Sequence, residues 1–333
     1  MSLQLSILDQ SPISEGMGAE EALAQTVQLA RHAEALGYER FWVSEHHDAS
    51  SLAGSSPEVL MAYLAAKTKA IRIGSGGVML PHYSPYKIAE NFRVLEGLAP
   101  GRIDAGIGRA PGGMPMSSLA LNRGEYRQVD RFPEQIDELL AYLAGDEENI
   151  PYPGLKATPL IQTRPDVWLL GSSPASALLA AKKGLPYTFA QFINGEDGQE
   201  SLAAYLNSFQ PSPWLSKPKS MVAVFTICAE TDEKAEWLAS SLDLSLLMTA
   251  QGMKSNGTPS PEKAAPYRYS EYERKFICEN RKRMVIGSPE RVREQYKRIS
   301  EEYQTENIMA VSIMYHFEDK LKSMELLAKA AEL

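Results

Sequence analysis

The chain has 333 residues, of which 44% are hydrophobic and 23% charged, and its formal net charge is −8. This balance describes a globular protein with a full core and excludes a disordered chain. Charges of both signs are spread along the chain without a basic block, so nucleic acid is not an expected partner.

Two features of the sequence indicate the cellular compartment, namely its two cysteines and its lack of long apolar segments. Cys228 and Cys278 lie far apart without metal-ligand spacing, which favours a reducing compartment and argues against a structural zinc site. No run of about 18 apolar residues occurs, and the amino terminus lacks the basic and apolar regions of a signal peptide. We therefore expect a cytoplasmic protein without a membrane partner.

Strand-like and helix-like segments alternate from the amino terminus. Strands are expected at residues 3–8, 39–44, 71–80, 102–107, 166–170, 187–192, 221–229 and 308–314. Helices are expected between them, at residues 19–36, 85–98 and 131–144 and after Pro57, Pro174 and Pro289. Eight such alternations predict an α/β fold, a (β/α)8 TIM barrel in which residues 1–333 form one domain.

Four of the expected helices start with the same dipeptide, a serine followed by a proline. These pairs are Ser56-Pro57, Ser84-Pro85, Ser173-Pro174 and Ser288-Pro289. Serine at the N-cap and proline at the first helical position both suit the exposed amides there.

Residues 246–285 break the alternation with several glycines, prolines and tyrosines. We interpret this segment as an insertion before the last β/α unit and as a candidate lid. Residues 146–165 form a shorter irregular stretch.

A cluster of titratable residues, Glu45-His46-His47-Asp48, follows the strand at 39–44. The carboxyl ends of strands are where barrel enzymes place their active sites. Neighbouring strand residues point to opposite faces, so one histidine is expected to face the barrel axis, oriented by Glu45 or Asp48. The alternatives are a solvated polar loop and a metal site that uses both histidines and an acid.

The stretch Gly171-Ser172-Ser173-Pro174-Ala175-Ser176 follows an apolar strand and opens a helix. Backbone amides, hydroxyl groups and the positive end of the helix dipole meet there, which is how proteins bind phosphate. The alternative is a well-capped helix without a ligand.

Two glycine-rich stretches follow or interrupt strands. Residues 106–113 superficially resemble a dinucleotide fingerprint, but Pro111 interrupts the helix opening and the stretch is not in the first βαβ unit, so we reject a Rossmann site. Arg109 remains a candidate anion partner. The three glycines within residues 73–78 indicate a bulge or the close approach of a planar or bulky group.

Four motifs in order resemble the bacterial luciferase-like flavin monooxygenase family, and within it the subgroup of single-subunit members. They are Glu45-His46-His47, the stretch Ile73–Pro81, the stretch Gly101–Arg109 and Gly171–Ser176. The resemblance covers nearly the whole chain, and residues 246–285 match least.

The resemblance implies roles for individual residues. His46 matches the catalytic acid/base, with Glu45 beside it, and Gly76-Gly77 falls where luciferase has a non-proline cis peptide beneath the flavin. The flavin phosphate is expected at Arg109, Gly171, Ser172, Ser173, Ala175 and Ser176. Gly108 stands where luciferase carries a cysteine.

The resemblance also implies an activity. It is a monooxygenase reaction in which reduced FMN (FMNH2) from a separate flavin reductase and O2 oxygenate a small organic substrate through a C4a-peroxyflavin. A homodimer formed through helices around residues 57–98 is expected. The alternatives are hydride transfer with the deazaflavin F420, a non-catalytic flavin-binding protein and a metal-dependent hydrolase. The substrate is not indicated.

Overall fold

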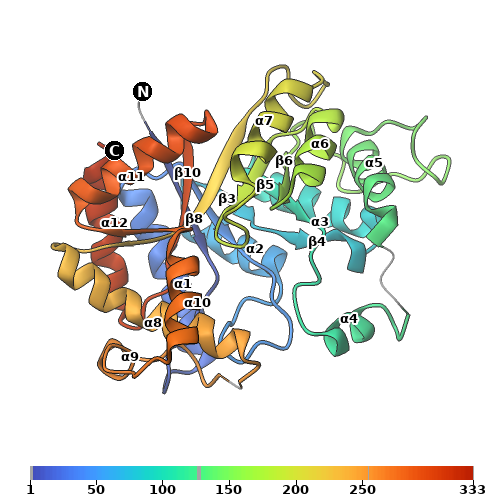
Figure 1. Cartoon of the computed structure of the whole chain (residues 1–333). Coiled ribbons are helices and arrows are strands. Elements are labelled where there is room, and N and C mark those ends of the chain that lie inside the picture. The colour runs from blue at the N-terminus through green and yellow to red at the C-terminus, as the bar shows by residue number, and fades with distance from the viewer. Residues whose placement is uncertain (1–2, 126–128, 254, 333) are drawn as a thin grey trace.

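The structure, a computed structural model, describes residues 3–125, 129–253 and 255–332. Parallel strands form a closed barrel that helices surround (Figure 1). The barrel strands are β1 (Gln4–Asp9), β2 (Arg40–Val43), β3 (Arg72–Ser75), β5 (Ile103–Gly108), β6 (Asp166–Gly171), β7 (Tyr187–Ala190), β8 (Ser220–Cys228) and β10 (Asn307–Val311). The ring closes because β10 pairs with both β1 and β8. The predicted TIM barrel is confirmed.

One strand was not predicted from the sequence. β9 (Met284–Gly287) pairs with the last four residues of β8, whereas an earlier part of β8 pairs with β10. β9 therefore extends the sheet beyond the closed ring, and residues 246–285 include its first two residues.

The strand expected at residues 71–80 is divided into β3 and β4 (Val78–Met79). A cis peptide bond joins Gly76 to Gly77 between them, as the resemblance implied. The neighbouring strand lies so close that a Cβ on Gly106 would be 1.9 Å from the Ser75 carbonyl oxygen. The Gly106 amide donates to the Ser75 hydroxyl at 2.9 Å. Glycine is required at position 106 because any side chain would overlap the adjacent backbone.

The helices begin where the serine-proline pairs predict. α2 (Pro57–Lys67), α3 (Pro85–Leu98), α6 (Pro174–Lys183) and α11 (Pro289–Tyr303) each start at the proline of such a pair. The hydroxyls of Ser56, Ser84 and Ser288 make no capping hydrogen bond. The proline at the first helical position is thus the feature that these starts share.

The other helices complete the outer layer and the connecting segments. They are α1 (Ala19–Ala35), α4 (Pro115–Leu121), α5 (Phe132–Ala144), α7 (Gly198–Ser208), α8 (Asp232–Ala250), α9 (Pro261–Ala264), α10 (Glu271–Arg281) and α12 (Phe317–Ala331), with short 3-10 helices η1 (Leu80–His82) and η2 (Val129–Arg131). α4 was not predicted, and it lies apart from the barrel strands (Figure 1). None of the described helices combines the length and the apolar character needed to span a membrane.

The barrel interior is apolar around two tryptophans and charged towards the amino-terminal ends of the strands. Trp42 and Trp168 pack edge to face, with ring centroids 5.6 Å apart. The buried carboxylate of Asp104 accepts hydrogen bonds from the Trp42 indole at 2.9 Å and from Arg72 at 2.6 Å, and Arg40 lies 3.3 Å away. This charge network fixes the orientation of the Trp42 indole.

Part of the segment expected to be an insertion, residues 255–264, lies across loops at the carboxyl ends of the barrel strands. Thr258 exchanges backbone hydrogen bonds with Ile13 and Glu15, which follow β1. Lys263 lies 2.7 Å from the Glu15 carboxylate, and the Ser50 hydroxyl donates to the Ser255 carbonyl. Residues 255–264 are therefore anchored to the loops that follow β1 and β2.

Candidate active site

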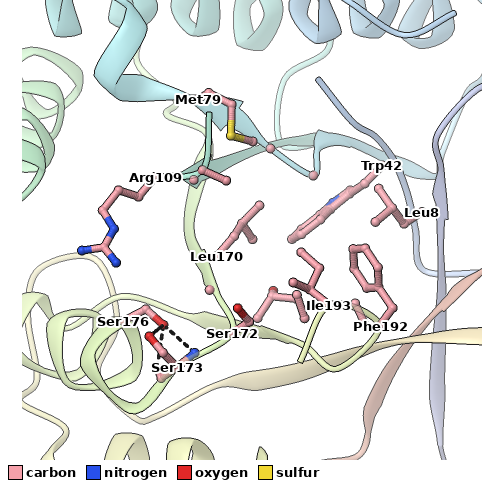
Figure 2. Close-up of a pocket in the computed structure, with 18 of the residues that line it drawn as sticks. Leu8, Trp42, Met79, Arg109, Leu170, Ser172, Ser173, Ser176, Phe192 and Ile193 are labelled. Atoms are coloured by element: carbon pink, nitrogen blue, oxygen red, sulfur yellow. Dashed lines mark hydrogen bonds between the residues drawn. The ribbon is translucent and has the colours of Figure 1, made fainter. Parts of the chain in front are cut away.

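A cavity of about 400 Å³ opens at the carboxyl ends of the barrel strands. Strands β1, β2, β5, β6, β7, β8 and β10 and the β3–β4 junction all contribute to its wall. Apolar side chains and polar groups occupy different sides of it (Figure 2). This division suits a ligand with a flat apolar part and an anionic part.

The apolar side is lined by Leu8, Trp42, Leu170, Phe192 and Ile193, among others. Two glycines leave room beside it. A Cβ on Gly76 would lie 2.7 Å from a Leu8 methyl group, and one on Gly77 would lie 2.5 Å from a Leu170 methyl group. The cis Gly76-Gly77 segment thus borders the cavity with bare backbone, which allows a planar group to approach closely.

The polar side is built where β6 leads into α6. The Ser176 hydroxyl donates to the Ser173 carbonyl at 2.7 Å and lies 3.0 Å from the Tyr187 hydroxyl. These contacts hold the first turn of α6, where Pro174 has no amide hydrogen and the Ser176 amide donates to the Ser173 carbonyl at 3.1 Å, which leaves the Ala175 amide facing out of the helix start. Arg109, just past β5, lines the same cavity. A helix dipole, an amide, hydroxyls and a guanidinium meet at this end of the cavity, a combination that suits an anion.

The structure brings together all the residues predicted to bind the cofactor. The cavity wall includes Gly76, Gly77, Arg109, Gly171, Ser172, Ser173, Ala175 and Ser176. The prediction that each of them contacts a flavin remains a prediction.

His46 lies near the cavity but is not part of its wall. Its Nε2 is 3.0 Å from Nε2 of Gln10, which follows the cavity residue Leu8 by two positions. Burial, together with the neighbouring His47, lowers the pKa of His46 to about 4. The imidazole is therefore neutral at pH 7, so it can accept a proton but has none to release as an imidazolium.

Glu45 does not orient His46, contrary to one of the sequence-based expectations. Its buried carboxylate accepts hydrogen bonds from the Met79 amide at 2.9 Å and from the Tyr83 hydroxyl at 2.7 Å, and it lies 2.7 Å from Nε2 of His47. Burial, with the adjacent Glu45 charge, raises the pKa of Tyr83. Asp48 has a backbone φ of +53° and an exposed side chain. The partner of His46 in the structure is Gln10, whose amide carries no charge.

The two adjacent histidines face different partners, as their alternation predicted. His46 faces Gln10, whereas His47 faces Glu45 and also forms a backbone bridge to Gly113. Within the described ranges, no group of three His, Cys, Asp or Glu side chains is arranged to hold a metal ion.

Several residues of the cavity were missed in the sequence. Trp42, Thr188 and Ala223 point inward from β2, β7 and β8, and the two-residue alternation of each strand was the signal that could have found them. Phe192 and Ile193 follow β7 after its regular part ends, so no periodic signal marks them.

The family model described as luciferase-like monooxygenase matches residues 3–305. The N-acetyl-S-alkylcysteine monooxygenase of Bacillus subtilis is 40% identical over 331 residues, which cover 98% of this chain and 98% of that protein. The chain belongs to the luciferase-like monooxygenase family, and it is a flavin-dependent oxidoreductase.

Solved structures agree with this assignment. The crystal structure of apo-MsnO8 is 36% identical, has a TM-score of 0.90 and covers 99% of each chain. A more distant structure shows the fold alone. It is the oxygenating constituent of 3,6-diketocamphane monooxygenase from Pseudomonas putida in complex with FMN, with 19% identity, a TM-score of 0.71, and coverage of 99% of this chain and 98% of that one.

Proposed function

We propose that the protein is the oxygenase of a two-component system that uses reduced FMN and O2 to oxygenate a small organic substrate. The observation that carries this proposal is that one cavity joins an apolar slot to an anion-binding helix start. The first fits an isoalloxazine ring and the second a phosphate. The 40% identical relative named as a monooxygenase supports oxygenation over hydride transfer, and an FMN-bound monooxygenase shares this fold.

The residues present fit FMN at both ends. The bare backbone of Gly76-Gly77 leaves space beside Leu8, Trp42 and Leu170 for a flat ring. At the other end, the amide of Ala175 and the hydroxyls of Ser172 and Ser173 would hold the phosphate, and Arg109 would neutralise part of its charge.

When bound, reduced FMN would supply the two electrons that activate O2. One oxygen atom enters the substrate and the other leaves as water, so FMNH2 becomes FMN. The apolar wall around Trp42 and Phe192 excludes bulk water from the reacting atoms. The neutral imidazole of His46 would serve as the acid/base, and the Gln10 amide, which donates a hydrogen bond to its Nε2, would hold the ring in place.

The same proposal covers the partners of the protein. A separate flavin reductase would provide FMNH2, and the cavity would admit one small organic molecule beside the flavin.

We propose a cytoplasmic homodimer that pairs through α2 and α3. Residues 246–285 would act as a lid within a single barrel domain, and the anchoring of residues 255–264 to the loops after β1 and β2 supports this role.

The direct test is flavin binding by the purified protein. We expect saturable binding of FMN, measured by absorbance or fluorescence titration, both with oxidised FMN and after reduction by dithionite. A parallel titration with F420 measures the hydride-transfer alternative. Binding of F420 in preference to FMN would contradict the proposal.

Arg109→Ala tests the phosphate end of the cavity. Loss of one charge-assisted contact should weaken FMN binding about 10- to 100-fold. Riboflavin, which lacks the phosphate, should bind the variant and the wild type equally. Arg268→Ala, which removes an exposed arginine outside the cavity wall, is the matched control. An unchanged FMN affinity in Arg109→Ala would remove Arg109 from the phosphate site.

A further inference from the structure

Thr188 lies in the barrel interior at the wall of the cavity. Its neighbours on β7, Tyr187 and Phe189, belong to the core between barrel and helices, so Thr188 points to the opposite side of the strand. In the parallel ladders it pairs with Leu170 of β6 and with Met221 of β8. Both neighbouring side chains are apolar, and Thr188 itself is 4% exposed.

The hydroxyl of Thr188 has no hydrogen-bond partner in the part of the chain that the structure describes. Other buried threonines differ. Thr26 donates to Asp9 at 2.6 Å, and Thr226 donates to a carbonyl of its own strand at 3.3 Å. Leaving a buried hydroxyl unpaired is unfavourable, so an unpaired hydroxyl at a cavity wall is one that a bound ligand can satisfy. Valine would fill the same space without this penalty.

Thr188 is also the residue at which an unpaired buried polar atom coincides with the cavity. Of the described residues with such an atom, Thr188 alone lines the cavity wall. Its hydroxyl can both donate and accept a hydrogen bond. The arrangement therefore fits a ligand that places a polar atom within an otherwise apolar slot.

The depth of Thr188 indicates which part of the ligand it meets. The anion-binding end begins at Gly171, past the point where Leu170 pairs with Thr188. Thr188 thus lies deeper in the barrel than the phosphate, beside Leu170, Ala190 and Ala223. A flavin whose phosphate lies at the start of α6 would reach this depth with its ring system, which carries carbonyl oxygens and ring nitrogens.

We propose that the Thr188 hydroxyl forms a hydrogen bond with the isoalloxazine ring and so positions the flavin. This inference rests on the proposed function. The unpaired buried hydroxyl of Thr188 destabilises the free protein, and the hydrogen bond to the bound flavin would remove this penalty.

Thr188→Val is the informative variant, because it removes the hydroxyl and keeps the shape. The free variant should melt at the same temperature as the wild type or higher, since no hydrogen bond is lost. Its affinity for FMN, riboflavin and lumiflavin should fall by a similar factor, about 5- to 10-fold for a neutral hydrogen bond. Thr188→Ser keeps the hydroxyl and should retain the wild-type affinities.

The three flavins separate the outcomes. If the wild type binds none of them, the proposed function fails. If the wild type binds all three and Thr188→Val binds them equally well, the role of Thr188 is overturned and the proposed function stands. A loss for FMN and riboflavin but not for lumiflavin would move the contact to the ribityl chain and overturn the ring assignment. A lower melting temperature for free Thr188→Val would also overturn it, because the hydroxyl would then serve the fold.

Discussion

At the scale of single residues, His46 should make the stability of the free protein depend on pH. Its pKa is about 4 in the folded protein and about 6.5 when unfolded. Between these values the unfolded chain binds a proton that the folded protein does not. The contribution of neutral His46 is therefore complete above pH 6.5 and is lost as the pH falls towards 4, by about 3 kcal/mol in all.

The measurement is urea unfolding at pH 7 and at pH 4.5, with wild type and His46→Gln compared at each pH. We expect the wild type to lose more stability on acidification than the variant. His316→Gln, which changes an exposed histidine, is the control and should follow the wild type. If wild type and His46→Gln lose stability in parallel, the imidazole is not held neutral by burial.

Residues at the site differed in how well the sequence predicted them. The cavity wall proposed to bind the cofactor was predicted because glycines, serines and an arginine follow apolar strands, and the end of a parallel strand fixes where such residues lie. The partners of His46 and Glu45 could not be found. Gln10 meets His46 across 36 residues of sequence, and Tyr83 meets Glu45 across 38. No local pattern encodes contacts of that kind.

At the scale of secondary structure, the close approach of β3 and β5 predicts a severe effect of a small substitution. Gly106→Ala would place a methyl group 1.9 Å from the Ser75 carbonyl oxygen, so one strand must shift. We expect a loss of about 3 kcal/mol or more in the free energy of unfolding, measured by urea denaturation.

Gly97→Ala is the matched control for this change. Gly97 is an exposed residue of α3, and an added Cβ would meet its nearest neighbour at an ordinary 3.6 Å. Because alanine favours a helix over glycine, the control should be neutral or more stable by up to about 1 kcal/mol. Equal effects of the two substitutions would show that the β3–β5 contact is not tight.

The elements that the sequence missed share a physical reason. β9 is four residues long and follows α10 at the end of a segment rich in breaks, so its short apolar run gave too weak a signal. α4 has seven residues, none of them buried, and therefore shows no apolar periodicity. By contrast, α2, α3, α6 and α11 were located to the residue because proline at the first helical position is a local feature.

At the scale of the whole molecule, the closed barrel was predicted from the residues themselves, whereas the homodimer was expected only from the family resemblance. Eight strands that alternate with helices favour a closed parallel barrel, and this alternation is visible in the sequence. The pairing of two copies depends on which outer side chains are exposed, and the sequence does not show this. The structure does show it for α2 and α3, where Val59, Tyr63, Val94 and Leu98 are all exposed.

These four exposed apolar residues suit the proposed homodimer through α2 and α3. Val59 and Tyr63 are four residues apart on α2, and Val94 and Leu98 are four apart on α3, so each pair lies on one side of its helix. Exposed apolar side chains gathered on neighbouring helices are typical of protein–protein interfaces. We expect the wild type to sediment as a dimer in analytical ultracentrifugation. Leu98→Glu would bury a charge in the interface and should give a monomer.

Tyr272→Glu on α10 is the control, because this side chain is 79% exposed against 69% for Leu98, and the variant should remain dimeric. A monomeric wild type, or a Leu98→Glu variant that stays dimeric, would show that this face does not pair two copies.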